Sequence, residues 1–433
     1  MITRLTFILL FLASFGVVKG QKLISIEDAI SIALKNNFDI LVARNDADID
    51  KTNNTAGNAG MLPTLQVNGS GSYSINNLHQ ELSSGTTNIT NGTKATGFSA
   101  STKLLWTLYD GGKMFVTRNK LTEIEAQGEI QYQGQVLSTI YDVISAYYNI
   151  IRQKQILTST NEVINYNKLR LTIAQASFNA GSADRTDLLQ AQIDLNVTME
   201  NAINQQYVID AAIKTLNLLL GKDASEITEV TDSIPLNYTP DEALLKQKLF
   251  SENASVKVFQ KQVDIARLSL KEFDAGFLPK VSFDAGYYLS QTENSKGTTS
   301  LNRTNGPQLG ASVTIPIFSA GENKRKTTTS KIQIESAEYD LQQVKLQVNT
   351  ELSNALKGFE NQQKLRKIEM ENKELTKTNI EISIQRLRLG QSTSLELHMA
   401  QESYAQSCTR LINFDYNLKI AEIKLKQLIA TLQ

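Results

Sequence analysis

The sequence predicts a mainly α-helical protein that carries two β-hairpins. Two long stretches without proline, residues 113–178 and 322–388, have apolar residues at helical spacing. Two other stretches, residues 62–109 and 278–318, alternate apolar and polar residues as strands do. These elements occur twice in the same order, so we interpret the chain as two structural repeats.

The chain begins with a predicted secretory signal peptide at residues 1–20. Arg4 precedes an apolar run, and Val18 and Gly20 stand at the positions of small residues before a cleavage point ahead of Gln21. The alternative is a membrane anchor, but the run is shorter than the ~20 residues that a spanning helix needs. No later stretch is apolar enough for such a helix, so only strands could place the mature chain in a membrane.

The predicted helices follow one pattern in both halves. A first helix runs from a cap at Ser25 and Asp28 to about Asn58, and Asp241 begins its counterpart. Each long helix ends at a glycine, Gly181 or Gly390, after which helical periodicity resumes for ~40 residues. The glycines therefore predict tight turns between antiparallel helices, far from the hairpins.

Short motifs recur at a nearly constant offset. AGMLP at 59–63 matches AGFLP at 275–279, which lies 216 residues later. FNAGSADRTDLLQAQ from Phe178 matches LRLGQSTSLELHMAQ from Leu387, which lies 209 residues later. Such an offset over more than a hundred residues indicates a duplication. The predicted units are the signal peptide at 1–20, a first repeat at 21–231 and a second repeat at 232–433.

Each hairpin is predicted to contain two strands of about ten residues. Leu65, Val67 and Tyr73 lie on one face of the first strand, and polar residues lie on the other. Ten residues suffice for a tilted strand that crosses a membrane, but the strands of a soluble sandwich alternate in the same way. Aromatic residues near strand ends and the polar loops 75–96 and 290–306 favour the membrane. The residues alone leave open a secreted or surface coiled-coil protein with a structural or adhesive role.

A membrane location would require several chains. Four strands cannot close a barrel, and open strand edges inside a bilayer would leave backbone groups without hydrogen bonds. Three chains would supply twelve strands, and their long helices could continue the wall as a tube.

Composition excludes several classes of function. Lys plus Arg and Asp plus Glu both total 44, so no excess of positive charge favours nucleic acid. The two histidines, His79 and His398, and the one cysteine, Cys408, are too few for zinc or haem chemistry. We interpret His398 as a helix-surface residue, Cys408 as a packed thiol, and Tyr147 and Tyr148 as core. No catalytic triad is found, and we expect no enzymatic activity, cofactor or metal.

The order of the motifs resembles that of the TolC family of outer-membrane efflux ducts. That order is a signal, SIEDAISIALKNN, AGMLP, a hairpin, LYDGGK, a long helix, FNAGSADRTDLLQAQ and LNLLLG, and then the whole set again. The resemblance covers the mature chain. It implies a homotrimer in the outer membrane of a Gram-negative bacterium, in contact with lipid. Long antiparallel coiled-coil helices would form a periplasmic tunnel, and four strands per protomer would contribute to a twelve-stranded trimeric barrel.

The resemblance also implies function and partners. The protein would be the passive exit duct of a tripartite efflux or type I secretion system, driven by an inner-membrane RND or ABC pump through a periplasmic adaptor. The two glycine turns would be periplasmic tips. The implied adaptor contacts are Asn179, Ala180, Gly181, Ser182, Leu389, Gly390 and Gln391. Glycine at these turns is also what a helix C-cap alone requires.

Three acids are candidates for the closed entrance. Asp187 and Glu396 each lie six residues after a tip glycine and match family positions, and Asp184 is a weaker candidate. Threefold symmetry would make each a ring of three carboxylates, which favours cations. An ordinary solvated helix face is the alternative for Glu396.

The sequence departs from the family at residues that close the tip. Met399, Leu387 and Ser392 replace the aspartate, tyrosine and arginine of the best-known duct. Those closing links therefore do not carry over, and Arg386 and Arg388 are candidate substitutes.

Overall fold

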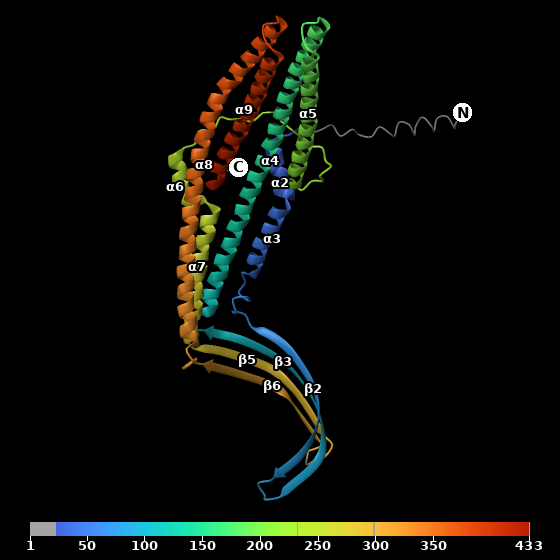
Figure 1. The fold of residues 1–433 in the computed structure, drawn as a ribbon. Helices are drawn as coiled ribbons and strands as arrows, with labels where there is room; N and C mark the ends of the chain where they lie inside the picture. The colour runs from blue at the N-terminus through green and yellow to red at the C-terminus, as the bar shows by residue number, and fades with distance from the viewer. Residues whose placement is uncertain (1–22, 232, 298, 433) are drawn as a thin grey trace, which may run out of the picture. The chain divides into compact units, whose positions relative to one another are not determined.

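The computed structural model describes residues 23–231, 233–297 and 299–432, and the predicted signal peptide lies outside them. The chain forms two compact units (Figure 1). The helical unit combines the described part of Met1–Asn45 with Ile130–Lys257 and Gln343–Gln433. The sheet unit combines Asp46–Glu129 with Val258–Gln342. None of the described helices has both the length and the apolar character needed to span a membrane.

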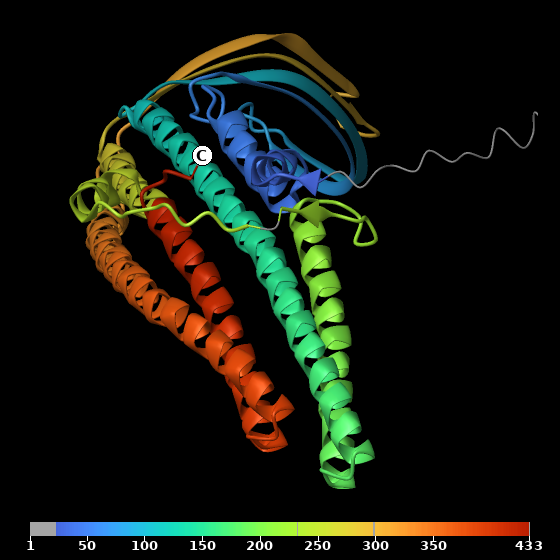
Figure 2. The ribbon, with the colours of Figure 1, turned by 90° about the horizontal axis from the view of Figure 1, so that it is seen from above.

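Two helical hairpins dominate the helical unit (Figure 2). α4 (Lys113–Asn179) is followed by α5 (Arg185–Leu219), and α8 (Glu322–Arg388) is followed by α9 (Ser394–Leu428). α4 and α8 both have 67 residues, and α5 and α9 both have 35. The long helices and the turns between them are thus confirmed.

The helix predicted from Ser25 to about Asn58 is in fact two helices, α2 (Ile26–Asn36) and α3 (Phe38–Asn53). The prediction of one helix was wrong because Asn37 interrupts it. This residue has extended backbone, and its Oδ1 accepts hydrogen bonds from the N–H groups of Asp39 and Ile40, which caps the second helix. The predicted cap at Ser25 is confirmed, since its Oγ accepts a bond of 3.0 Å from the Asp28 N–H.

The second half repeats this break. α6 (Glu242–Glu252) and α7 (Ala254–Asp274) are separated by Asn253, and the 3-10 turn η1 (Ala275–Phe277) follows. The Asp241 Oδ1 accepts from the Leu244 N–H at 3.1 Å, so the predicted start at Asp241 is also confirmed.

Two buried asparagines fix these short helices to the long ones. The Asn37 Nδ2 donates to the Leu219 carbonyl at the end of α5, at 2.9 Å. The Asn253 Nδ2 donates to the Leu428 carbonyl at the end of α9, at 3.0 Å. Each asparagine therefore uses its oxygen to cap one helix and its nitrogen to satisfy the free carbonyl of another.

Apolar side chains of α2, α4, α5 and α9 form the main core of the helical unit. Tyr147 is almost fully buried, contacts Tyr148 edge to face, and donates its hydroxyl to the Ile24 carbonyl at 2.9 Å. Ile24 belongs to β1 (Leu23–Ile24), which pairs in parallel with β4 (Glu229–Val230). The prediction that Tyr147 and Tyr148 are core residues is confirmed.

The sheet unit contains one antiparallel sheet with the strand order β2-β3-β5-β6. Its strands are β2 (Thr64–Glu81), β3 (Thr87–Asp110), β5 (Lys280–Asn294) and β6 (Leu301–Thr314). The predicted hairpins are β2–β3 and β5–β6, and pairing of β3 with β5 joins them. β2 and β6 are left as edge strands.

The strands have 18, 24, 15 and 14 residues, so the predicted length of ten was wrong. The stretch 75–96, expected to be a loop, continues β2 and β3 down to a turn at 82–86, and Ile75 pairs with Lys94. Its threonines favour strands, so Ser, Thr and Asn do not mark a loop here. The stretch 290–306 also extends strands, since β5 continues to Asn294 and β6 begins at Leu301.

Candidate functional site

The ten predicted site residues all lie at the two turns of the helical unit. Asn179 ends α4 and Asp187 lies in the first turn of α5, whereas Glu396 lies in the first turn of α9. Both turns lie at the same end of this unit (Figure 1). Every one of the ten residues is exposed.

The first turn is closed by backbone hydrogen bonds. The Gly181 N–H donates to the Phe178 carbonyl at 3.0 Å, and the Ser182 N–H donates to the Ser177 carbonyl at 2.9 Å. These two bonds define a Schellman motif, which requires a left-handed residue. Gly181 supplies it with φ of +72°. Since a Cβ here would meet no atom within 4 Å, the backbone angle alone explains the glycine.

The second turn has the same construction. The Gly390 N–H donates to the Leu387 carbonyl at 3.0 Å, the Gln391 N–H donates to the Arg386 carbonyl at 2.8 Å, and φ of Gly390 is +71°. The guanidinium of Arg386 also donates to the Gln391 carbonyl at 3.0 Å. This side chain thereby braces the turn that its own carbonyl helps to close.

Glu396 is held by its own turn. Its backbone N–H donates to the Thr393 Oγ1 at 3.2 Å, and its Oε2 accepts from the Ser392 Oγ at 2.5 Å. Arg386 approaches the same Oε2 at 3.9 Å. Both side chains are more than half exposed, so water screens this pair and it contributes little stability. Arg386 is thus the candidate substitute that contacts a tip acid, whereas Arg388 has no ion-pair partner among the described residues.

The acids of the first turn are arranged differently. Asp184 is the N-cap residue of α5, but its side chain makes no capping hydrogen bond, and the Asp187 N–H donates to the Asp184 carbonyl at 3.2 Å. Negative side chains are favourable at a helix N-terminus, where the helix dipole is positive. Within the described residues, no hydrogen bond or ion pair links these two acids to Glu396.

A buried polar cluster behind the turns was not predicted. Arg170 of α4 has only 2% of its surface exposed, and its Nε donates to the Ser394 Oγ at 3.1 Å. Its NH1 donates to the Asp194 Oδ2 at 2.6 Å and lies 3.2 Å from the His398 Nδ1. We call Arg170, Asp194, Ser394 and His398 the Arg170 cluster. It joins three helices, α4, α5 and α9.

Sequence reasoning missed this cluster because Arg170 and Ser394 are 224 residues apart. His398 was interpreted as a surface residue, and its side chain is indeed 40% exposed, yet its Nδ1 lies 3.2 Å from the Asp194 Oδ2. No sequence motif connects these positions.

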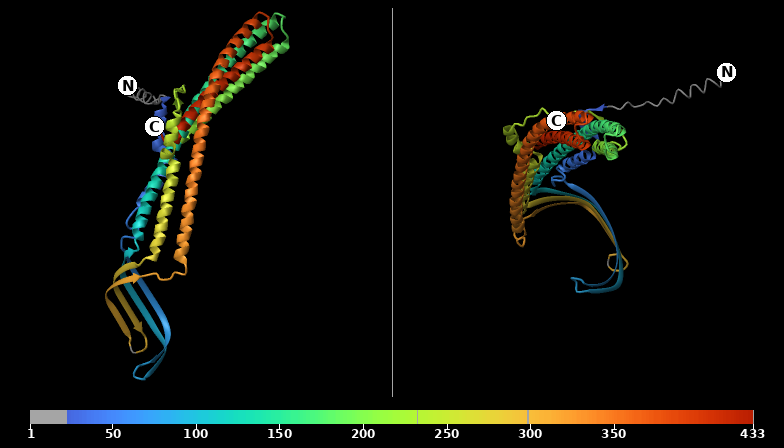
Figure 3. Two further views of the ribbon diagram at one scale, coloured as in Figure 1. Left: turned by 90° about the vertical axis from the view of Figure 1, so that its left-hand side faces the viewer. Right: turned by 45° about the horizontal axis from the view of Figure 1, so that its top comes forward.

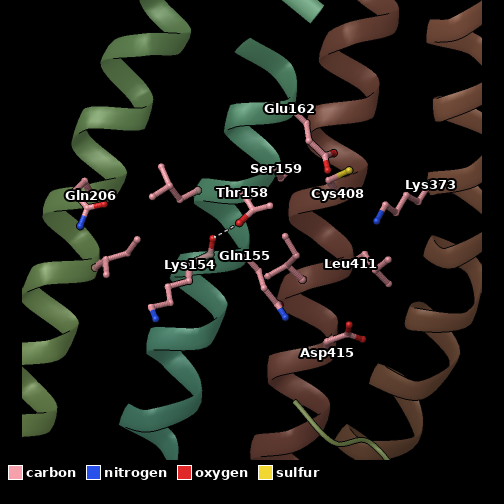
Figure 4. Close-up of a pocket in the computed structure, with 13 residues that line it drawn as sticks. Lys154, Gln155, Thr158, Ser159, Glu162, Gln206, Lys373, Cys408, Leu411 and Asp415 are labelled. Carbon is pink, nitrogen blue, oxygen red and sulfur yellow. Dashed lines mark hydrogen bonds between the residues drawn. The ribbon is translucent and has the colours of Figure 1, made fainter. Parts of the chain in front are cut away.

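A pocket of about 680 Å³ lies between all four long helices (Figure 4). It is lined by Lys154 and Lys373 and by Glu162 and Asp415, so its charges are mixed. Figure 4 shows Glu162 beside Cys408, which is buried as predicted. Among the described residues no group of three or more His, Cys, Asp or Glu could hold a metal ion.

The order of the helices across the unit is α5, α4, α9, α8. The Gln205 Nε2 of α5 donates to the Gln153 Oε1 of α4 at 2.8 Å, and the Tyr404 hydroxyl of α9 donates to the Glu162 Oε2 of α4 at 3.0 Å. Ion pairs then join α9 to α8, and Figure 3 shows the four helices side by side. Burial raises the pKa of Tyr404, so its hydroxyl remains a donor. α5 and α8 are therefore the outer helices.

Comparison with known proteins identifies the family. The family of outer membrane efflux proteins matches the chain twice, over residues 29–222 and 245–431. The outer membrane efflux protein BepC of Brucella suis is 22% identical over 419 residues, which cover 96% of this chain and 87% of BepC. The proteases secretion protein PrtF of Dickeya chrysanthemi is 23% identical over 75% of this chain and 69% of PrtF.

Solved structures share the fold. The outer membrane channel CmeC of Campylobacter jejuni superposes with a TM-score of 0.79 at 16% identity, over 94% of this chain and 85% of that one. The predicted fold class, channel function and outer-membrane location are confirmed, and the adhesive alternative receives no support. The predicted resemblance to the TolC family is therefore correct, and this chain belongs to the family of outer membrane efflux proteins.

Proposed function

We propose that this channel is the trimeric exit duct of a tripartite efflux or type I secretion system. The observation that carries the proposal is the sheet with two unpaired edges, β2 and β6. Four strands cannot enclose a pore, and a bilayer does not tolerate free strand edges. Three copies, each pairing β6 with β2 of its neighbour, would close a barrel of twelve strands.

The exposed faces of the edge strands support a place in lipid. Leu65, Val67 and Tyr73 of β2 and Leu309 and Val313 of β6 are each more than half exposed in the single chain. They alternate with polar residues along their strands. An apolar outer face and a polar inner face are typical of a membrane barrel.

The outer helices support closure of the tunnel by further copies. On α8 and the residue after it, large apolar side chains recur every seven residues and are more than half exposed. This α8 stripe consists of Ile368, Leu375, Ile382 and Leu389. A seven-residue apolar repeat is the pattern of a coiled-coil contact.

α5 carries a matching set of four apolar side chains that are more than half exposed. This α5 stripe consists of Leu189, Ile193, Ile203 and Tyr207, in which the first and third residues, and the second and fourth, are fourteen residues apart. Since α5 and α8 are the outer helices of one chain, we infer that the α8 stripe packs along the α5 stripe of the next chain. Three such seams would close a ring.

The two-repeat organisation is part of the proposal. The repeats, 21–231 and 232–433 after removal of the signal peptide at 1–20, would place equivalent helices around the tunnel. Equal helix lengths, equivalent glycine turns and equivalent asparagine bonds support this division.

The exposed turns remain the proposed periplasmic tips. Glu396, Asp187 and Asp184 would line the entrance, and the seven tip residues Asn179, Ala180, Gly181, Ser182, Leu389, Gly390 and Gln391 would contact a periplasmic adaptor. The names of BepC and PrtF refer to efflux and to protease secretion respectively. The proposal accordingly allows an RND or an ABC pump.

A photo-crosslinker at Gln391 tests the partner. In cells, the trimer recovered from the outer-membrane fraction should carry a captured adaptor, identified by mass spectrometry. The same crosslinker at Gln406, an exposed residue farther along α9, is the matched control and should capture much less. A monomer that captures no adaptor from either position would contradict the proposal.

Ion selectivity tests the entrance acids. In planar bilayers Glu396→Gln should lower the cation preference of the purified channel by about twofold or more, because a ring of three carboxylates is lost. Asp187→Asn should act in the same direction. Unchanged selectivity in both variants would remove these acids from the entrance.

A further inference from the structure

We propose that the Arg170 cluster holds α9 against α4 and α5 as one rigid body, so that the entrance of the duct widens at the seams between chains. The inference rests on the proposed trimer. It concerns which of two kinds of helix junction moves: α4 with α9 inside a chain, or α8 with α5 of the next chain.

The junction inside the chain contains a buried ion pair. Arg170 and Asp194 are 2% and 13% exposed at their side chains, and the same guanidinium also binds Ser394 of α9. Sliding α9 away would break that hydrogen bond and expose a charge pair that is now satisfied. Because a buried charge is strongly penalised when it loses its partners, this junction resists separation.

Other contacts reinforce the same junction. The rings of Tyr166 and Tyr404 meet edge to face with centroids 5.9 Å apart, and the Tyr404 hydroxyl donates to Glu162 at 3.0 Å. Glu162 and Tyr166 lie on α4 and Tyr404 lies on α9. The contacts thus extend along several turns of both helices.

The equivalent junction between chains lacks the cluster. With the offset of 209 residues, α4 corresponds to α8, α5 to α9, and α9 to α5 of the next chain. The positions equivalent to Arg170, Asp194, Ser394 and His398 are then Asn379, Ser403, Arg185 and Leu189. These four residues are exposed in the single chain. They provide no carboxylate to pair with Arg185, so the seam depends on the apolar stripes.

The two junctions therefore differ in kind. A seam of apolar side chains can slide and repack among similar contacts, whereas the Arg170 cluster has one geometry. Widening by movement of whole chains would leave each cluster intact. The pocket of about 390 Å³ beside the cluster supplies positions for a test, since Val163 of α4 and Ala405 of α9 both line it.

Matched cross-links distinguish the junctions. In a Cys408→Ser background, Val163→Cys with Ala405→Cys would be bridged by a two-carbon bismaleimide inside a chain. The equivalent pair, Asn372→Cys with Asn196→Cys, would be bridged between chains. Denaturing gels separate the results, because only the second link yields dimers and trimers. We expect the first link to leave bilayer conductance within twofold of the unlinked channel, and the second to reduce it at least tenfold.

Removing the cluster provides the second arm. Arg170→Met should raise the resting conductance at least threefold, and the α4–α9 cross-link in the same chain should return it to the wild-type value. A merely structural role would not produce this rescue. If the α4–α9 link closed a trimer that otherwise conducts, the role proposed for the Arg170 cluster would be wrong and the proposed duct would stand. If the protein neither trimerised nor conducted, the proposed duct would be wrong, and the role of the Arg170 cluster with it.

Discussion

The α4–α5 and α8–α9 hairpins share their backbone but not the polar contacts inside them. Helix lengths, the bonds of both turns and the asparagine bonds are nearly the same. The first hairpin contains Arg170–Asp194, whereas the second contains Arg366–Asp415 and Glu369–Arg410. Turn and cap chemistry thus specifies the architecture in both halves, and the buried charges distinguish the halves.

The difference also reaches single backbone positions. Gly221 follows α5 with φ of +64°, and its equivalent after α9 is Ala430 with φ of +53°. Likewise Gly111 has φ of +75°, and its equivalent Ala320 has φ of +50°. At these two positions the second half adopts the left-handed conformation without glycine, at a cost in strain.

The largest effect is expected from the buried arginine, Arg170, because the equivalent position in the second half is Asn379. Arg170→Met should destabilise the helical unit by about 3–5 kcal/mol, because the mostly buried carboxylate of Asp194 loses the guanidinium that neutralises it. The check is the midpoint of heat-induced loss of helical circular dichroism in the detergent-solubilised trimer. Asn379→Met, at the equivalent position of α8, should change the midpoint little, because Asn379 carries no charge that a partner must neutralise. Similar shifts in both variants would contradict the difference between the halves.

Glu369 should give the second half a pH dependence of its own. Burial alone would raise the pKa of Glu369, but hydrogen bonds from Arg410, Ser407 and Asn372 outweigh it and lower that pKa. A lowered folded-state pKa contributes stability above the unfolded value near 4.5, and this is lost as pH falls through the folded pKa. Glu369→Gln should cost about 2–3 kcal/mol at pH 7.

A pH series of unfolding midpoints checks this. The difference between wild type and Glu369→Gln should shrink below pH 4.5. Thr160→Val, at the equivalent position of α4, should give a difference that does not change with pH over that range. A constant difference for Glu369→Gln would refute the assigned role.

The hydrogen bonds of Asn37 and Asn253 should contribute similar stability in the two halves. Asn37→Ala and Asn253→Ala should each destabilise the protein by about 1–2 kcal/mol, since each removes a helix cap and leaves a carbonyl without its donor. The same melting assay applies. If one of the two substitutions left the midpoint unchanged, the two asparagines would share a geometry but would not contribute equally to stability.

The smallest effect is expected at the left-handed alanine. Ala430→Gly should stabilise the protein by about 1 kcal/mol, because glycine adopts this conformation without strain. The reverse change in the first half, Gly221→Ala, should destabilise by more, because a Cβ there would lie 2.5 Å from the Asn36 carbonyl oxygen. A destabilising Ala430→Gly would show that the methyl group contributes packing that exceeds the strain.

Local patterns predicted the parts of the fold that depend on neighbours in sequence. Helical periodicity predicted the long helices, and Gly181 and Gly390 predicted the two turns. The break at Asn37 was missed because asparagine fits an amphipathic helix as well as a cap. Strand lengths were wrong because Ser, Thr and Asn suit strands with a polar face as well as loops.

The candidate site divides in the same way. The two turns lie where the sequence predicted them, since each follows from its glycine, and the roles of the tip residues stay a prediction. The Arg170 cluster could not be predicted, because α4, α5 and α9 must pack before Arg170 meets Asp194 and Ser394. The role of an exposed acid such as Glu396 depends on other chains, which one sequence does not describe.

The length of β3 bears on which part of the protein is exposed outside the cell. Its 24 residues, at ~3.3 Å each, make a strand of ~80 Å, far longer than the ~25 Å apolar band of an outer-membrane barrel, even when tilted. The paired end of β2 is polar, with Asn76, Asn77, His79, Gln80 and Glu81. In the proposed orientation, this end of the hairpin extends past the lipid headgroups and is the surface that an antibody or a phage would meet first.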